Sequence, residues 1–396
     1  MSSETESKLG ELFARLPQPD PEVTERALVR ALAAVPPPVR RSERSARAVA
    51  FLLAAAVALL AVAAGALAAV GALHVSFGQT KPAAERGKTS AEAQLTVPAG
   101  AHGIAATVGR RLWLTTSNGL RLQGLPVSAA ALSPHALYVA AGVGNSLVAM
   151  APDGRRAWSY PTPGSVTSIA WAPDGLRIAY VVSLNGRFRL YVIEGNGRGN
   201  QLLDAAVRST RPAWRADSLA VAYVAAGGRP VVYDFGHASH TVISSPAARD
   251  AIFLAFASRG GELAVATPKR VVLWRAAGGV GSTAFGDAAI AGLGWVGNDL
   301  AVALNRPVAS LAQTSHVRLF RVGDAGTLTE IGQVVSSARI EALDALGDRL
   351  TVAVATRAGV RVFSAATLDV ITTALLRSPA LLQLPVGSRI SSIAAR

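Results

Sequence analysis

A recurring pattern of short apolar runs, separated by turn residues, begins near residue 101 and constrains the fold of this chain most. The best example is residues 166–200, in which three apolar runs are joined by Pro-Asp-Gly and Asn-Gly and followed by Gly-Asn-Gly. Such runs predict β-strands, and Asp-Gly and Asn-Gly readily adopt the positive φ angles of tight hairpins. We therefore expect strands over Ser168–Trp171, Arg177–Val182 and Phe188–Ile193.

Similar units recur along the chain at a nearly constant spacing. The steps between six anchor positions are 39, 43, 42, 39 and 50 residues. Repeats of about 40–45 residues with about four short strands each are typical of β-propeller blades. The sequence therefore predicts an all-β propeller over residues 101–396. The anchors are Leu132, Trp171, Trp214, Phe256, Trp295 and Ala345.

The two ends of this region complete the pattern. Residues 390–395 resemble the innermost strand at 166–171, whereas residues 103–125 contain about three strands without an inner strand of their own. Joining the two ends would build one blade from both termini and close the ring. This arrangement gives seven blades, and six is the alternative if the unit after residue 336 is irregular.

The unit at residues 168–193 resembles the TolB-like propeller repeat, which is also called the WD40-like PD40 repeat. The hallmark of that repeat is an aromatic-x-Pro-Asp-Gly turn between inner strands, and the Pro-Asp-Gly is absent from most other units of this chain. The whole chain is similar to membrane-anchored propellers of actinobacterial type, which implies the bacterial cell envelope but no defined function. The matching residues are Trp171, Pro173, Asp174 and Gly175, with Trp214 and Trp295 at equivalent aromatic positions.

These repeat residues are expected to have structural roles. Asp174 should hydrogen-bond to the backbone of its turn, and Gly175 should supply the positive φ angle. The tryptophans Trp171, Trp214 and Trp295 should pack between blades and not form a stacking platform for a ligand. We therefore assign no catalytic, cofactor-binding or metal-binding residue among them.

Residues 48–73 form the second constraining feature, an apolar run of 26 residues in a stretch without charge from Ala48 to Thr80. A helix of this length is about 39 Å long and can cross a hydrocarbon layer of about 30 Å. A cleaved signal peptide is the competing interpretation, because residues 66–68 read Ala-Leu-Ala. The run is longer than the apolar core of a signal peptide and follows 47 residues, so the sequence favours a single-pass transmembrane helix.

The charges around this helix predict its orientation and divide the chain into parts. Residues 1–47 are a short head, helical or partly disordered with two small apolar stripes, and residues 74–100 read as a linker. The excess of basic residues before the helix favours a cytoplasmic N-terminus and an extracytoplasmic propeller in the cell membrane. The basic residues counted are Arg30, Arg40, Arg41, Arg44 and Arg47 before the helix, against Lys81, Arg86 and Lys88 after it.

The composition gives little support to catalysis. The chain has no cysteine, which excludes disulfides, iron–sulfur clusters, Cys-ligated zinc and a thiol nucleophile. The sequence holds no Gly-x-Ser-x-Gly elbow, Walker loop, His-Glu-x-x-His or kinase motif. His237 and His240 alone form a weak metal signal on an apparent loop. We expect no enzyme activity, no cofactor and no metal.

The formal net charge is +14, of which residues 97–396 carry +12, almost entirely as dispersed arginine. This pattern is typical of a soluble surface, although an anionic envelope polymer could also bind there; we expect no nucleic-acid partner. The predicted function is a non-enzymatic, membrane-anchored module that binds a protein, peptide or envelope polymer outside the cytoplasm. One alternative is a transmembrane signalling or anti-sigma-like regulator whose residues 1–47 bind a cytoplasmic partner. A propeller-based hydrolase or lyase is the second.

Overall fold

The structure is a computed structural model that describes residues 102–118, 121–276, 278, 280–286, 288–306, 315–323, 326–336, 339–346, 349–356, 359–365, 382–383 and 390–395. The predicted head, transmembrane helix and linker (1–47, 48–73 and 74–100) lie outside the described residues. Within the described residues, no helix has the length and apolar character needed to span a membrane.

In these ranges the chain forms seven four-stranded antiparallel sheets, one of which holds strands from both ends of the region. That sheet consists of β28 (Ile390–Ala395), β1 (Gly103–Val108), β2 (Arg111–Thr116) and β3 (Arg121–Pro126). The other six sheets each take four consecutive strands: β4 (Ala130–Leu132), β5 (Val139–Val143), β6 (Ser146–Met150) and β7 (Arg156–Pro161); β8 (Ser165–Trp171), β9 (Arg177–Leu184), β10 (Arg187–Glu194) and β11 (Gln201–Val207); β12 (Ala213–Trp214), β13 (Ala220–Val224), β14 (Pro230–Asp234) and β15 (Ser239–Val242); β16 (Phe253–Phe256), β17 (Leu263–Ala266), β18 (Arg270–Trp274) and β19 (Val280–Ala284); β20 (Ala289–Val296), β21 (Asp299–Asn305), β22 (Ser315–Val322) and β23 (Leu328–Ser336); β24 (Arg339–Leu346), β25 (Arg349–Thr356), β26 (Gly359–Ala365) and β27 (Leu382–Gln383). A short 3-10 helix, η1 (Pro246–Ala248), follows β15.

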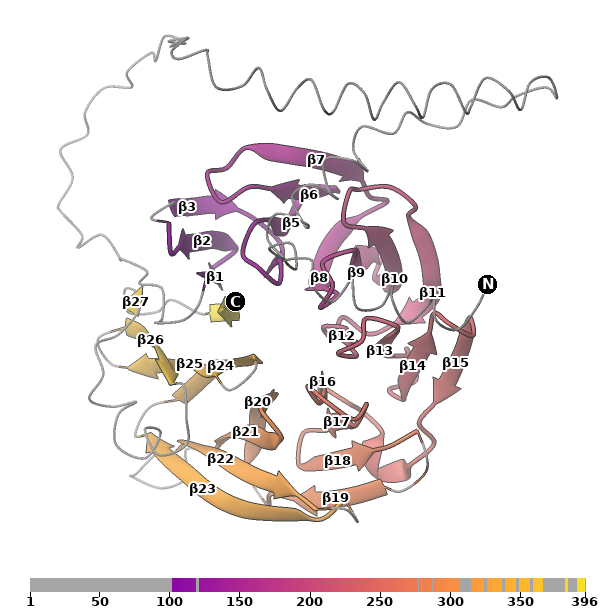
Figure 1. Cartoon of the computed structure of the whole chain (residues 1–396), viewed down its shortest axis with the longest axis vertical. Helices are drawn as coiled ribbons and strands as arrows, with labels where there is room; N and C mark the ends of the chain where they lie inside the picture. The colour runs from indigo at the N-terminus through magenta and orange to yellow at the C-terminus, as the bar shows by residue number, and fades with distance from the viewer. Residues whose placement is uncertain are drawn as a thin grey trace, which may run out of the picture. The chain divides into compact units, whose positions relative to one another are not determined.

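The seven sheets are arranged as the blades of a β-propeller (Figure 1). The first strand of each consecutive sheet, such as β8 or β12, lies near the centre, and the fourth, such as β11 or β15, lies at the rim. The described residues thus agree with the predicted count of seven units and not with the alternative of six.

The best sequence repeat is also a regular blade. The three expected strands are present as β8, β9 and β10, each two or three residues longer than predicted, and β11 completes the sheet. Asn185 and Gly186 have φ angles of 50° and 75° in the hairpin between β9 and β10. Positive φ at both central residues is the geometry of a type I′ turn, which Asn-Gly favours.

The last strand pairs with the first strand of the region. β28 runs antiparallel to β1, with Ile393 opposite Ala106 and Ala395 opposite Ile104. Ile393 is 2% exposed, so its side chain is part of the apolar interior. The prediction that both ends contribute to one sheet is confirmed by this pairing.

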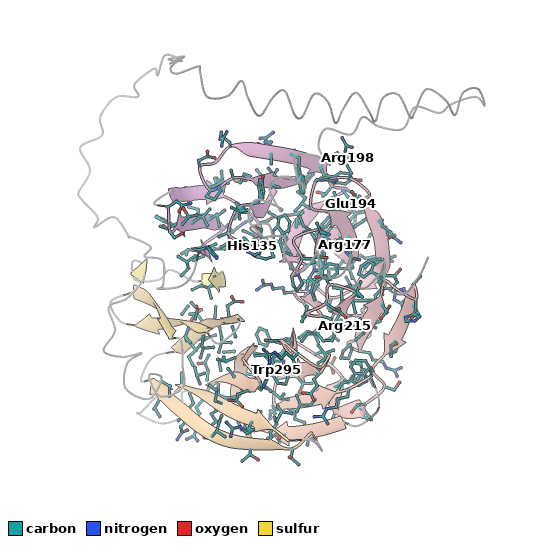
Figure 2. All side chains as sticks on the ribbon, viewed as in Figure 1. His135, Arg177, Glu194, Arg198, Arg215 and Trp295 are labelled. Carbon is teal, nitrogen blue, oxygen red and sulfur yellow. The ribbon has the colours of Figure 1, made fainter. Side chains whose placement is uncertain are left out.

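The hydrophobic core is divided among the contacts between successive sheets. Each buried cluster takes side chains from two neighbouring sheets; one joins Val181 and Leu190 of β9 and β10 to Val221 and Tyr223 of β13. Figure 2 shows side chains filling the spaces between the sheets. Each blade is therefore held mainly by the blade before it and the blade after it, as propeller repeats require.

His316 lies in β22, opposite Leu304 of β21 and Val335 of β23, and is only 9% exposed. Burial is the main cause that lowers the pKa of His316, and the positive charges of Arg306 and Arg318 lower it further. Gln333 and Glu330 favour the charged form and offset part of this effect. The folded protein therefore prefers the neutral imidazole.

We expect the free energy of unfolding to fall as the pH is lowered from about 7 to about 5. The lowered pKa of His316 means that the unfolded chain takes up this proton more readily than the folded protein. The stability that the neutral His316 contributes is therefore present above the ordinary pKa of histidine and is lost as the pH falls. His316→Gln, which does not titrate, should make this dependence shallower in urea unfolding at stepped pH. The same slope in both proteins would contradict the prediction.

Candidate functional site

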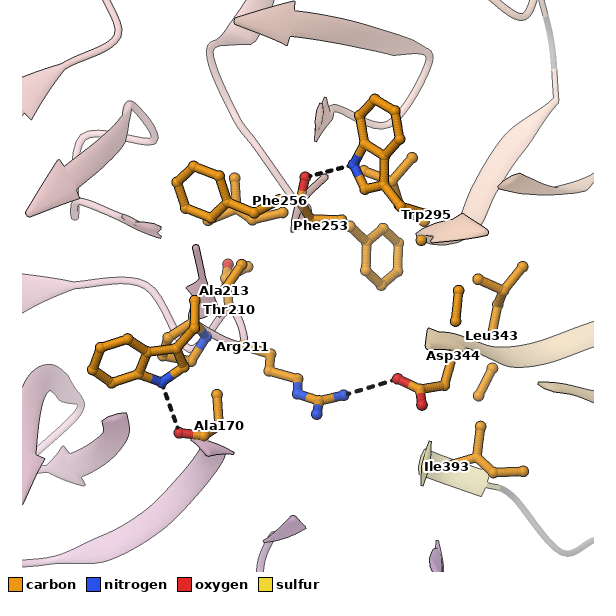
Figure 3. Close-up of a pocket in the computed structure, with 18 of the residues that line it drawn as sticks. Ala170, Thr210, Arg211, Ala213, Phe253, Phe256, Trp295, Leu343, Asp344 and Ile393 are labelled. Carbon is orange, nitrogen blue, oxygen red and sulfur yellow. Dashed lines mark hydrogen bonds and ion pairs between the residues drawn. The ribbon is translucent and has the colours of Figure 1, made fainter. Parts of the chain in front are cut away.

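A cavity of about 660 Å³ lies where the innermost strands of the sheets meet. Its lining takes residues from all seven sheets, including Ile393 of β28, Leu132 of β4 and Leu293 of β20. Figure 3 shows this cavity with side chains reaching into it from several sides. Its volume lies within the range of small-molecule and side-chain pockets, and its central position makes it the candidate functional site.

Aromatic side chains form much of the wall. Trp171 and Trp214 are the last residues of the inner strands β8 and β12, Trp295 is the next-to-last residue of β20, and Phe253 and Phe256 lie on β16. Each indole N–H donates a hydrogen bond to a backbone carbonyl on the inner strand of the preceding sheet (two are drawn in Figure 3). The acceptors are the carbonyls of Ala131, Ala170 and Ala255, at 3.1, 3.0 and 2.9 Å from Trp171, Trp214 and Trp295 respectively.

These bonds tie each of the three tryptophans to the neighbouring blade, and all three residues also line the cavity. The indoles are therefore rigid wall elements whose orientation is set by the neighbouring backbone. The sequence predicted packing at these positions but not the cavity that the packing encloses.

We expect Trp295→Phe to lower the free energy of unfolding by about 1–3 kcal/mol. The change removes the indole donor at 2.9 Å from the Ala255 carbonyl and leaves a smaller ring in a site that is 4% exposed. Chemical denaturation of both proteins would measure the difference. Equal midpoints would mean that the bond adds nothing between these blades.

The Pro-Asp-Gly turn lies between β8 and β9. Oδ1 of Asp174 accepts a hydrogen bond from the Leu176 N–H at 2.9 Å, and Gly175 has a φ angle of 73°. The Asp174 N–H donates to Oγ of Ser218, in the equivalent turn of the next sheet, at 3.0 Å. Pro173 lines the cavity whereas Asp174 does not.

Arg177, at the start of β9, further joins these two blades (Figure 2). Its guanidinium donates a hydrogen bond to the Ser218 carbonyl at 2.7 Å and lies 4.4 Å from the centre of the Phe235 ring. A cation over an aromatic face is stabilising, so this arginine reinforces blade packing. Arg177, one of the dispersed arginines of residues 97–396, thus stabilises the contact between two blades.

The charged groups of the cavity come from segments far apart in the chain. Arg211, which precedes β12, extends to Asp344 on β24, and their nearest side-chain atoms are 3.8 Å apart (Figure 3). Glu341, also on β24, pairs at 3.4 Å with Arg339. The carboxylate side chains are 11% and 17% exposed for Asp344 and Glu341, against 43% for Arg211 and 65% for Arg339.

The histidine pair noted in the sequence does not form a metal site with a third ligand. His240 lies in β15, not on a loop, and its Nδ1 is 3.0 Å from the Tyr223 hydroxyl; His237 precedes the strand and lies 3.2 Å from Asp234. In the part of the chain that the structure describes, no group of three or more His, Asp or Glu side chains could hold a metal ion.

No family model matches the chain, and no curated protein matches it. Among solved structures, it is similar to a functionally unknown protein from Desulfotomaculum acetoxidans, at 13% identity over 73% of this chain and 98% of that one, with a TM-score of 0.51. It also matches the WD40 repeats of RRP9 (12% identity, 74% and 86% covered, TM-score 0.48) and the β-propeller domain of Cps50 (Swd1) from Myceliophteria thermophila (12%, 66% and 95%, TM-score 0.44). At such identities, structural likeness concerns the fold alone.

Proposed function

We propose that this protein is a binding module whose propeller takes a protein or peptide partner at the central cavity. The observation that carries the proposal is the cavity itself, which has fixed aromatic walls and a few charged side chains. Recognition sites commonly combine an apolar surface with a small number of placed polar groups. The cavity lies at the centre of the ring, where loops of several blades can contact the same partner.

The cavity chemistry favours binding over turnover. Among the described residues that line it there is no histidine, lysine or tyrosine, and its two carboxylates both lie in ion pairs. A hydrolase or lyase needs an acid or base positioned beside a nucleophile or a reacting atom. The alternative of a propeller-based enzyme therefore has less support than a binding function.

The proposal includes a membrane anchor. Residues 48–73 remain the predicted single-pass helix, with the N-terminus in the cytoplasm and the propeller outside. The likeness to TolB-type repeats stays a resemblance of one or two units. An anionic envelope polymer stays a second class of ligand for the arginine-rich surface. Protease treatment of intact cells tests the orientation, because protection of the propeller would place it in the cytoplasm.

Photo-crosslinking tests the binding site directly. The full-length protein would carry benzoylphenylalanine either in place of Phe253, in the cavity wall, or in place of Leu202, which lies on β11 and is 45% exposed. We expect a defined partner to be captured from position 253 and not from position 202. Capture from both positions alike, or from position 202 alone, would move the binding site away from the cavity.

A signalling role is a second candidate function, favoured by the two apolar stripes in residues 1–47. In this case the head binds a cytoplasmic protein while the propeller binds outside. Capture of a cytoplasmic protein by a peptide of residues 1–47, and its loss when the apolar residues Val23 and Leu28 become Ser, would support the role. No capture by the peptide would count against it.

A further inference from the structure

We propose that the central cavity binds a cationic side chain of the partner, the guanidinium of arginine or the ammonium of lysine, at the carboxylates of Asp344 and Glu341. In the structure Arg211 pairs with Asp344 and Arg339 pairs with Glu341, and the ligand's cation would replace Arg211 at Asp344. The inference rests on the proposed function and specifies the chemistry of the group that the cavity recognises.

The two carboxylates of β24 have no counterpart on β20, the inner strand of the preceding sheet. β20 and β24 each shift register by one residue at the same point, after Ile290 and after Ile340. Counting from this shift, Glu341 corresponds to Ala291, and Asp344 corresponds to Gly294. Blade geometry therefore does not require carboxylates at these places, since the equivalent strand is built with alanine and glycine.

The burial of these carboxylates makes their pairing important. Both are mostly buried, and both sit on short side chains fixed to a paired strand, with Asp344 opposite Thr351. A buried carboxylate is costly unless a cation or hydrogen-bond donors compensate it. In the described structure, ion pairs with Arg211 and Arg339 contribute to this compensation.

In both ion pairs the arginine is more exposed than the carboxylate, and this difference favours a cationic ligand over an anionic one. Arg211 and Arg339 are long and considerably more exposed than the carboxylates they contact. Replacing the guanidinium of Arg211 by one from a ligand leaves Asp344 in an ion pair, and Arg211 can turn toward water. An anion bound to Arg211 would instead withdraw the cation from a mostly buried carboxylate, which is unfavourable.

The walls suit the rest of such a side chain. The lining includes Leu343 on β24, Trp295 on the neighbouring strand β20, and Phe253 on β16 (Figure 3). The methylene stem of lysine or arginine packs well on apolar surface while its charged end reaches a carboxylate. Aromatic rings near a cation add further attraction. The cavity thus offers an apolar wall and a negative end for one extended basic side chain.

Titration of the full-length protein with N-acetyl-L-argininamide, followed by tryptophan fluorescence, tests the inference. Three tryptophans line the cavity, so occupancy should change their emission. We expect Arg211→Gln to bind the probe about five- to tenfold tighter, because the internal competitor is gone. Asp344→Asn should weaken binding at least tenfold. N-acetyl-L-norleucinamide has a similar apolar side chain without the charge and is the control probe. It should bind weakly to the unaltered protein, to Arg211→Gln and to Asp344→Asn.

Thermal unfolding of each variant shows whether it is folded. Arg211→Gln alters a side chain that is 43% exposed, and Glu341→Gln provides a second variant that leaves the pair of Arg211 and Asp344 in place. Glu341→Gln should also weaken binding of the argininamide probe. Weaker binding of this probe to Arg211→Gln, or binding unaffected by both carboxylate variants, would overturn the inference.

Two further results separate this inference from the proposed function. Tighter binding of N-acetyl-L-glutamic acid α-amide than of the argininamide, lost in Arg211→Gln, would assign an anionic ligand and overturn the inference. Capture of a partner at position 253 that neither the argininamide nor Asp344→Asn reduces would also overturn it, while the binding-module function would stand. Competition by the argininamide in that crosslinking experiment would support both.

Discussion

Removal of residues 390–396 should lower the free energy of unfolding by on the order of 5 kcal/mol, one of the two largest effects that the structure predicts. These residues contain β28, which pairs with β1 from Ile104 to Val108. Truncation leaves the backbone groups on that edge of β1 without their partners and removes Ile393 from the interior, where it is 2% exposed. Thermal unfolding of the full-length and truncated chains, followed by near-ultraviolet circular dichroism, measures the loss.

Deletion of Arg396 alone is the matched control, because β28 ends at Ala395. This variant should unfold as the full-length chain does. A synthetic peptide of residues 388–396 should restore part of the stability of the truncated protein, since it can pair with the exposed edge of β1. If the truncated chain unfolds at the same temperature as the control, the pairing of the two ends does not hold the propeller together.

The fold could be predicted from sequence because its repeats carry local turn chemistry. Asn185 and Gly186 in the β9–β10 hairpin, and Gly175 in the preceding turn, adopt the positive φ angles that their residue types favour. Such signals act over a few residues, and turn residues such as glycine, asparagine and aspartate recur between the apolar runs of the other units. They are strong enough to show the period even where Pro-Asp-Gly is missing, as in the unit anchored at Trp295, where Val-Gly-Asn follows the tryptophan.

The pairing of β28 with β1 could be predicted for a different reason. Residues 390–395 repeat the pattern of an inner strand, and residues 103–125 contain about three strands without an inner strand of their own. The lengths of the strands were harder to predict, because β8, β9 and β10 are each two or three residues longer than the strands expected from the sequence. Pairing with neighbours, and not the residues alone, decides where a strand ends.

The charged part of the cavity could not be predicted in this way. Arg211 and Asp344 lie in different blades, and their distance of 3.8 Å depends on the curvature of the whole ring. No local pattern encodes that curvature. The sequence did offer one signal: β24 has two acidic residues where β20 has alanine and glycine. Aligning the two strands requires knowledge of the register shift at Glu341, which only the structure shows.

Gly164→Ala adds only one methyl group and should still lower the free energy of unfolding by about 2–4 kcal/mol, the second of the two large effects. Gly164 lies between β7 and β8, and a Cβ atom there would overlap the backbone carbonyl oxygen of Ser183. Ser183 is held in β9 by pairing with Phe188 and Ser165, and the Gly164 carbonyl accepts a hydrogen bond from the Thr162 hydroxyl at 2.7 Å. Neither backbone can therefore move aside without breaking strand pairing.

Gly227→Ala is the control for this substitution. A Cβ atom at Gly227 would meet no heavy atom within 4 Å, and its φ angle lies outside the left-handed region. The change should leave the stability within about 0.5 kcal/mol or raise it slightly, because alanine restricts the unfolded chain more than glycine does. Urea unfolding of the two variants compares a methyl group added against the buried backbone of β9 at position 164 with one added in open space at position 227. Similar midpoints for both would mean that the contact between Gly164 and β9 yields easily, and that the inner strands tolerate small displacements around the cavity.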